Sequence, residues 1–257
     1  MWRLACNRSA DRRRHSVSCI RVIEVTDSQP QTQSAFPLAL ITCTGLAFAL
    51  WSGYCFLIAK QPATFDQPLV RAIVRIVCVL IPAIVFQLWH ARRFPEMPNG
   101  DPFGFRRNWV WGLITGMVVA AILAGLILFD PMRSEARAVP TDVATWLNFI
   151  IGSPLAEEML FRCVIAIQIY SISQNLDGAK GWDSWISAII LSSVLFAAFH
   201  VPGWLAANQF APREMIVESA KLFGYGAAFA VVFLVTRSIW APLIPHCVNN
   251  FMLQLYP

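Results

Sequence analysis

Pro154-Leu155-Ala156-Glu157-Glu158-Met159-Leu160-Phe161-Arg162 lies inside an apolar segment that runs from Val143 to Ser173. Ionisable groups at membrane depth cost several kcal/mol, so those that occur there mark functional sites by default. On a helix, Glu158 and Arg162 are four residues apart with the acid on the N-terminal side, which favours an ion pair on one face. Glu157 lies about 100° round the helix from Glu158. It is therefore predicted to have no local partner and to be available for chemistry.

The composition is that of a membrane protein. Hydrophobic residues make up 57% of the chain and charged residues 14%, which excludes an ordinary soluble domain. The net charge of +5 does not indicate nucleic-acid binding, because six of the twenty Lys and Arg residues lie before residue 22 and others flank apolar segments. The seven Cys form no C-x-x-C pair and lie mostly in apolar segments, so they are predicted to be reduced and buried.

Seven apolar segments are long enough to cross a bilayer, which takes about 20 residues. They are Phe36–Ala59, Ala72–Trp89, Trp109–Phe129, Val143–Ser173, Trp185–Ala207, Met215–Thr236 and Ile239–Tyr256. Gly152, Ser153 and Pro154 interrupt the fourth, where Ser153 could cap and Pro154 could begin a new helix. The predicted fold is an all-α polytopic membrane bundle of seven spans, or eight if this break is a turn.

The distribution of basic residues predicts domains and orientation. Residues 1–35 hold six Arg and no apolar h-region, so they are not a cleavable signal peptide and are predicted to be a disordered tail. Residues 36–257 are predicted to form the transmembrane domain, with the motif-bearing core at 143–257. With the N-terminus inside, the tail and inner connections hold twelve Lys and Arg and the outer connections six. This asymmetry predicts a multi-pass protein of the cell membrane with a cytoplasmic N-terminus.

Two later apolar segments also carry polar groups. His200 is the only ionisable residue between Asp183 and Arg213, and His246 and Asn250 are four apart, so they share a helix face. Singly, each residue fits a structural role, such as a hydrogen bond between helices. Together they supply a free carboxylate, two imidazoles and an amide. A hydrolytic centre needs this set: a base for water, a partner for the base, and donors for an oxyanion.

The ordered motifs resemble a known family. E-E-x-x-x-R, F-x-x-x-H and H-x-x-x-N stand here as Glu157–Arg162, Phe196–His200 and His246–Asn250, in three separate late segments. This set is similar to that of the CAAX prenyl protease and bacteriocin-processing family of intramembrane endopeptidases, which are often classed with metalloproteases. The resemblance covers about residues 143–257. Cys163 departs from it, since many members have Gly after the Arg, and the change concerns local helix packing more than chemistry.

The resemblance implies a role for each catalytic position. Glu157 looks like the general base that activates water, with His200 as its partner. His246 and Asn250 look like the groups that hold the scissile carbonyl and the developing oxyanion. The spacing selects Asn250 over the adjacent Asn249.

The same resemblance assigns structural roles to the remaining motif residues. Glu158 and Arg162 look like the ion pair that orients the motif helix. Phe161 and Phe196 are expected to be packing residues and not substrate contacts.

Two mechanisms remain open for the metal question. A zinc site could use Glu157, His200 and His246 as ligands, with water in the fourth position, but the sequence has no H-E-x-x-H motif. With Glu157 bound to metal and Glu158 engaged by Arg162, no carboxylate would remain to deprotonate the water. We therefore expect a metal-free site and keep zinc as the alternative.

The expected function is hydrolysis of a peptide bond in a membrane-delivered or lipidated peptide or protein. Its expected partners are that substrate and the lipid bilayer, with no nucleic acid. The alternatives are a non-enzymatic scaffold or bacteriocin-immunity-type protein on the same fold and, more distantly, a proton-coupled transporter in which Glu157 and the histidines form a relay. The sequence shows no inverted repeat of the kind found in many secondary transporters, which argues against transport.

Overall fold

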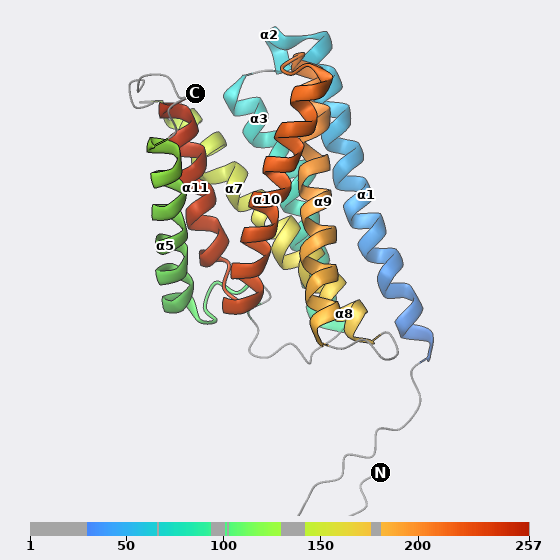
Figure 1. Ribbon diagram of the computed structural model, residues 1–257. Helices are drawn as coiled ribbons and strands as arrows, with labels where there is room; N and C mark the ends of the chain where they lie inside the picture. The colour runs from blue at the N-terminus through green and yellow to red at the C-terminus, as the bar shows by residue number, and fades with distance from the viewer. Residues whose placement is uncertain are drawn as a thin grey trace, which may run out of the picture.

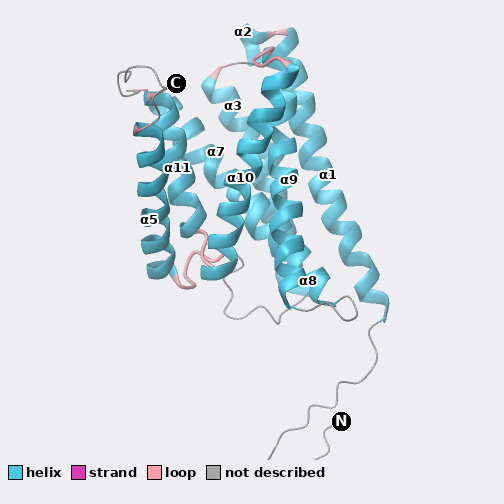
Figure 2. Cartoon of the chain, in the orientation of Figure 1, coloured by secondary structure: helices cyan, strands magenta, loops and turns pink. Residues whose placement is uncertain are grey.

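The computed structural model describes residues 30–65, 67–93, 101, 103–129, 142–175 and 181–256. These residues are helical apart from short connections, and no strand occurs within these ranges (Figures 1 and 2). The prediction of an all-α membrane bundle is confirmed. The predicted disorder of residues 1–35 stays a prediction for residues 1–29, which lie outside the described ranges, while the helix α1 already begins at Pro30.

Each of the seven predicted apolar segments is helical. The first three passes are α1 (Pro30–Lys60) with the short α2 (Pro62–Phe65) after it, then α3 (Pro68–Arg75) continuing through a π-helical stretch (Ile76–Leu80) into α4 (Ile81–Arg93), then α5 (Trp109–Leu128). The fourth pass joins α6 (Val143–Thr145), π-helical Trp146–Gly152, α7 (Ser153–Glu158), π-helical Met159–Ala166 and α8 (Ile167–Asn175). The last three are α9 (Gly181–Ala207), α10 (Pro212–Thr236) and α11 (Trp240–Leu255). α1 begins at the end of the bundle opposite to the end where α11 finishes (Figure 1).

Five segments of the described chain are long and apolar enough to cross a membrane. They are Pro37–Lys60, Leu69–His90, Trp109–Leu128, Gly181–Ala207 and Pro212–Thr236. The other two passes carry two of the three polar motifs, and α11 has only 16 residues. Large apolar side chains stay exposed on the outer helices, for example Ile41 at 67% and Leu126 at 66%. Such a surface suits contact with lipid, because every helix satisfies its own backbone polar groups.

The fourth pass does not turn where the sequence is interrupted. Gly152 has right-handed helical φ and ψ of −67° and −43°, and Ser153 makes no capping bond. Pro154 has no N–H to donate to the carbonyl four residues earlier, and its ring would clash there in a regular α-helix. The wider π-helical turn before α7 accommodates this ring without ending the helix. The predicted cap at Ser153 is therefore wrong, and the number of passes is seven.

Two glycines on α5 fix the position of α11. Gly112 and Gly116 share one face, and a Cβ added at Gly116 would lie 2.7 Å from the carbonyl oxygen of Trp240. Small residues four apart let two membrane helices approach closely. α5 and α11 accordingly lie side by side over much of their length (Figure 1). This packing places His246 toward the centre of the bundle, where its side chain is buried.

A polar loop before α5 supports the start of α11. The Asp101 carboxylate accepts hydrogen bonds from the backbone N–H groups of Phe105, Arg106 and Arg107. Partial burial alone would raise the pKa of the Asp101 carboxyl, but these N–H groups together with that of Gly104 hold it below its ordinary value. The ordered loop then presents the Phe105 carbonyl to Trp240 Nε1 at 2.9 Å.

Candidate active site

The three motifs come from α7, α9 and α11, which meet in the middle of the bundle. The structure brings Glu157, His200 and His246 together: Glu157 Oε2 lies 3.7 Å from His200 Nε2 and 3.8 Å from His246 Nε2. Asn250 lies one helical turn after His246 and borders the same cavity. All four residues that the sequence singled out as catalytic candidates therefore lie around one space.

Glu158 is held by two cationic or polar partners from different elements. Its Oε2 accepts a hydrogen bond from Arg162 Nε at 2.9 Å, and both side chains are fully buried. The Arg162 guanidinium also lies over the Phe196 ring, 5.1 Å from its centroid. The other carboxylate oxygen, Oε1, lies 2.7 Å from His246 Nδ1. Glu158 thus joins the motif helix to α9 through Arg162 and to α11 directly.

Glu157 has one occupied and one available oxygen. Its Oε1 accepts a hydrogen bond from the Ser153 hydroxyl, one turn earlier on α7. This contact corrects the expectation that Glu157 has no local partner. Its Oε2 is buried and has no hydrogen-bond partner among the described residues. Ser153 therefore orients the carboxylate so that the second oxygen faces the two histidines.

The partners of the two imidazoles determine which ring nitrogens face Glu157 with a lone pair. His200 Nδ1 lies 2.9 Å from the Phe196 carbonyl oxygen, and a carbonyl only accepts, so Nδ1 carries the proton. His246 Nδ1 faces Oε1 of Glu158, whose other oxygen accepts from Arg162 Nε, so this Nδ1 also donates. In a neutral ring Nε2 then offers a lone pair toward Glu157 Oε2, and in a doubly protonated ring it offers an N–H.

Two imidazole nitrogens and a carboxylate oxygen match the ligand types of a catalytic zinc site. Bonds of 2.0–2.1 Å in a tetrahedral site would, however, place ligand atoms about 3.3 Å apart, and the separations from Glu157 Oε2 are 3.7 and 3.8 Å. Within the described ranges, no group of three or more His, Cys, Asp or Glu side chains is placed to hold a metal ion.

The two adjacent amides on α11 have different surroundings. Asn250 Nδ2 donates to the Phe149 carbonyl at 2.8 Å, and its second N–H remains for another acceptor. Asn249 is buried, and its Oδ1 has no hydrogen-bond partner in the described part of the chain. Both side chains border the same cavity. The geometry is compatible with Asn250 as an oxyanion donor.

Two cavities meet at the candidate catalytic groups. One of about 290 Å³ extends between α10 and α11, and one of about 570 Å³ extends between α1, α3 and α9. Both are bordered by the same five residues: Arg75, Phe149, Glu157, His200 and Trp204. A substrate that crosses from one cavity to the other therefore has to pass Glu157 and His200.

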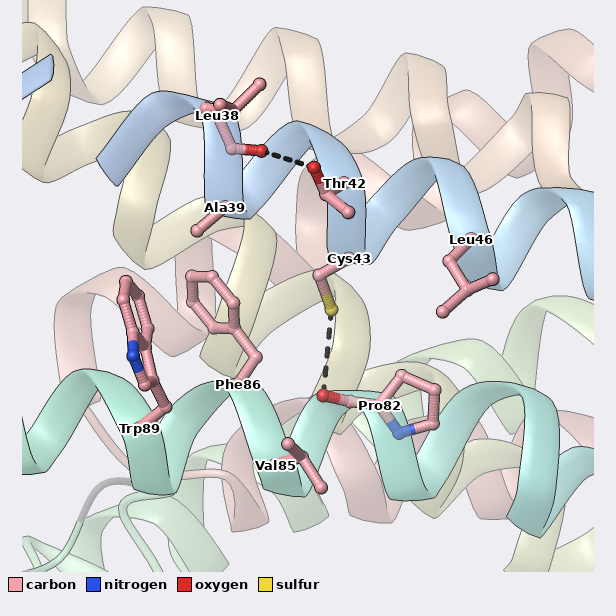
Figure 3. A pocket seen from close by; sticks show the side chains of 9 residues that line it. All are labelled: Leu38, Ala39, Thr42, Cys43, Leu46, Pro82, Val85, Phe86 and Trp89. Atoms are coloured by element: carbon pink, nitrogen blue, oxygen red, sulfur yellow. Dashed lines mark hydrogen bonds between the residues drawn. The ribbon is translucent and has the colours of Figure 1, made fainter. Parts of the chain in front are cut away.

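A separate apolar hollow lies between α1 and α4. Figure 3 shows its lining, in which Phe86 and Trp89 of α4 lie near Leu38 and Ala39 of α1. The Cys43 thiol donates to the Pro82 carbonyl at 3.6 Å (Figure 3). The hollow has no charged lining residue and shares none with the two cavities at Glu157. It therefore lacks the groups needed for hydrolysis.

The motif residues expected to pack do so. Phe161 and Phe196 are buried with an edge-to-face contact at 5.2 Å between centroids, although Phe196 also borders the smaller cavity. Cys163, the departure from the family pattern, is fully buried, and its thiol donates to the Phe103 carbonyl at 3.4 Å. The Gln87 side chain donates to the Cys163 carbonyl. The Cys side chain, which is larger than the Gly of many family members, is therefore accommodated at this position.

Sequence reasoning missed two residues of the site. Ser153 was expected to cap a helix, but it binds Glu157. Arg75 is not among the predicted site residues, but it borders both cavities. The sequence contains a signal for each residue. Ser153 is four residues before Glu157, which is the spacing of a contact on one helix face. Arg75 is a charge at membrane depth, which marks function by default.

The family comparison agrees with this site. Residues 139–252 match the family model described as Rce1-like, type II CAAX prenyl endopeptidase. This part of the chain is similar to that family. The matched range contains all seven fixed residues of the three motifs, so the family resemblance noted in the sequence is confirmed. The five long apolar helices of the described residues make the chain an integral membrane protein. Neither a curated protein nor a solved structure matches it.

Proposed function

We propose that this Rce1-like chain is an intramembrane endopeptidase that hydrolyses a peptide bond in a membrane-delivered, prenylated peptide or protein. The observation that carries the proposal is the buried, unpartnered Oε2 of Glu157, faced by the Nε2 atoms of His200 and His246. A carboxylate in this setting is a base with room for one water molecule. The family description supports a prenylated C-terminal substrate.

The proposed mechanism uses each group once. Glu157 Oε2 takes a proton from water, and the water oxygen attacks the scissile carbonyl carbon. The carbonyl electron pair moves onto its oxygen, which accepts hydrogen bonds from Asn250 Nδ2 and from the Nε2–H of protonated His246. Glu158 supports that proton on His246 from the other side of the ring. Collapse breaks the C–N bond, and the proton on Glu157 passes through His200 to the leaving amine.

The direct test is cleavage of a defined probe by the purified protein. The probe is a peptide with a prenylated Cys four residues from its C-terminus and a fluorophore and quencher on either side of the expected cut. We expect Glu157-dependent release of the C-terminal fragment in detergent or liposomes. An unchanged probe in the presence of well-folded protein would contradict the proposal.

Asn250→Ala is expected to lower kcat for the probe by about 10²–10³-fold, because loss of one oxyanion donor costs that much. Activity should stay measurable, since Glu157 and His200 are intact. Asn249→Ala is the matched control, because Asn249 is adjacent and borders the same cavity. A larger loss in Asn249→Ala than in Asn250→Ala would reverse the assignment of the oxyanion donor.

The metal-free mechanism predicts that activity survives removal of metal ions. Purified active protein should contain far less than one zinc per chain by elemental analysis, and chelator treatment should leave the cleavage rate of the probe unchanged. The contrary result is stoichiometric zinc with activity that is lost to chelator and restored by zinc. That result would make Glu157, His200 and His246 metal ligands.

We also propose that the N-terminus lies in the cytoplasm, on the basis of the basic residues in the tail and inner connections. α1 begins and α11 ends at opposite ends of the bundle, so the C-terminus then lies on the outer side.

A further inference from the structure

Two arginines border the larger cavity at the candidate site. Among the described residues that line it, the charged ones are Arg71, Arg75 and Glu157. The rest of its wall is mostly apolar and aromatic, as in other small-ligand sites. Arg75 borders both cavities beside Glu157, and Arg71 borders the larger one.

Arg75 is bound in place by neutral groups. Its Nη1 donates to the Asn148 carbonyl at 3.2 Å and to the Asn148 Oδ1 at 2.5 Å. Its guanidinium carbon lies 5.5 Å from the Trp51 ring centroid and 5.4 Å from that of Phe149. The ion contacts of Glu157 within the described chain are with the two histidines, so Arg75 does not form a direct salt bridge with it. A guanidinium has five N–H donors, and this one is fixed in orientation before any ligand binds.

Arg71 adds a second cation on the same helix face. It lies one turn before Arg75 on α3, about 6 Å along the axis, and its guanidinium carbon is 5.5 Å from the same Phe149 ring. Like charges four residues apart repel each other on a helix. A carboxylate matches the planar geometry of a guanidinium and can accept two of its N–H groups at once.

We propose that Arg75 and Arg71 bind the C-terminal carboxylate of the peptide substrate, so that the larger cavity receives the segment released by cleavage. This inference rests on the proposed function, because it needs a peptide bond positioned at Glu157. Arg75 and Glu157 border the same space, which places the carboxylate within a few residues of the scissile bond at about 3.3 Å per extended residue. The volume of about 570 Å³ suits a short peptide end. Both arginines lie before the family match, which begins at residue 139.

The test compares two versions of the prenylated probe, one with a free C-terminal carboxylate and one with a C-terminal amide. Binding is measured by fluorescence anisotropy in the Glu157→Gln background, where the probe stays intact, and cleavage is measured in the otherwise unchanged protein. We expect the acid to bind about 10-fold or more tightly than the amide, as for a hydrogen-bonded charge pair. Arg75→Gln should reduce the ratio to about one, and Arg71→Gln should reduce it in part. Arg213→Gln, an exposed arginine outside both cavities, should leave it unchanged.

If Arg75→Gln fails to fold, Arg71→Gln still tests the proposal, because it leaves the hydrogen bonds between Arg75 and Asn148 in place. Equal binding of acid and amide by the protein with both arginines would overturn the proposal, and so would an Arg75→Gln variant that weakens both probes equally. Phosphatidylglycerol could also displace the acid and the amide probe equally, in a manner that depends on Arg75. That third contrary result would identify a lipid phosphate as the bound anion. If the acid is preferred but no cleavage occurs, the carboxylate site stands and the proposed enzymatic function fails.

Discussion

Glu157→Gln is expected to lower kcat for the prenylated probe by about 10²–10⁴-fold, the contribution typical of general acid–base catalysis. The amide keeps the shape of the side chain and its contact with Ser153, but it cannot take a proton from water. The measurement is the initial cleavage rate of purified protein together with its thermal midpoint. The matched control is Glu218→Gln, because Glu218 borders the smaller cavity but pairs with Lys221 at 2.6 Å.

His200→Ala should cause a comparable loss, since its Nε2 is one of the two groups that face the available oxygen of Glu157. Glu218→Gln should change the rate far less than either. If Glu157→Gln and His200→Ala keep wild-type cleavage, the enzymatic proposal fails. If they also keep full biological activity where no cleavage is detected, the scaffold alternative is supported.

The fold could be predicted because the bilayer restricts what an apolar segment can form. Residues that cross lipid must satisfy their backbone groups internally, so each long apolar segment became a helix. The break at Gly152 was harder, since Gly, Ser and Pro in sequence fit both a turn and a distorted helix. In the structure, π-helical stretches stand before and after α7, so the helix continues through this segment and Glu157 and Glu158 are buried.

The local part of the site followed from helix spacing. The four-residue rule predicted the contact between Glu158 and Arg162, and the structure shows it at 2.9 Å. The same rule applied to Ser153 would have found the partner of Glu157. It was overlooked because Ser before Pro is also a common helix start.

The rest of the site depends on contacts between distant segments. His246 is 88 residues from Glu158 in the chain, and its Nδ1 contact at 2.7 Å depends on how α11 packs against α7. Arg75 lies on α3, outside the motif-bearing core, and nothing in its spacing relates it to Glu157. Helix periodicity contains no information on which faces of different helices meet.

The buried pair of Glu158 and Arg162 gives the second large prediction, on stability. Arg162→Ala leaves the Glu158 carboxylate at 0% exposure without its cation, and removal of one partner of a buried pair typically costs ~3–5 kcal/mol. Glu158→Ala should cost a similar amount, because the guanidinium of Arg162 is then left buried. Thermal unfolding of the purified variants in one detergent measures both losses. Single variants as stable as the wild type would show that the pair does not contribute to folding.

A double variant separates stability from chemistry. Glu158→Leu combined with Arg162→Met removes both charges and keeps apolar volume, so it should be more stable than either single variant and give a clear coupling energy in a double-mutant cycle. It should still be inactive, because His246 Nδ1 loses the carboxylate that fixes its proton and holds its ring. Arg237→Met is the matched control, since Arg237 lies over the Tyr170 ring at 4.7 Å, away from the two cavities. A stable double variant with wild-type cleavage would mean that Glu158 acts on neither His246 nor the reaction.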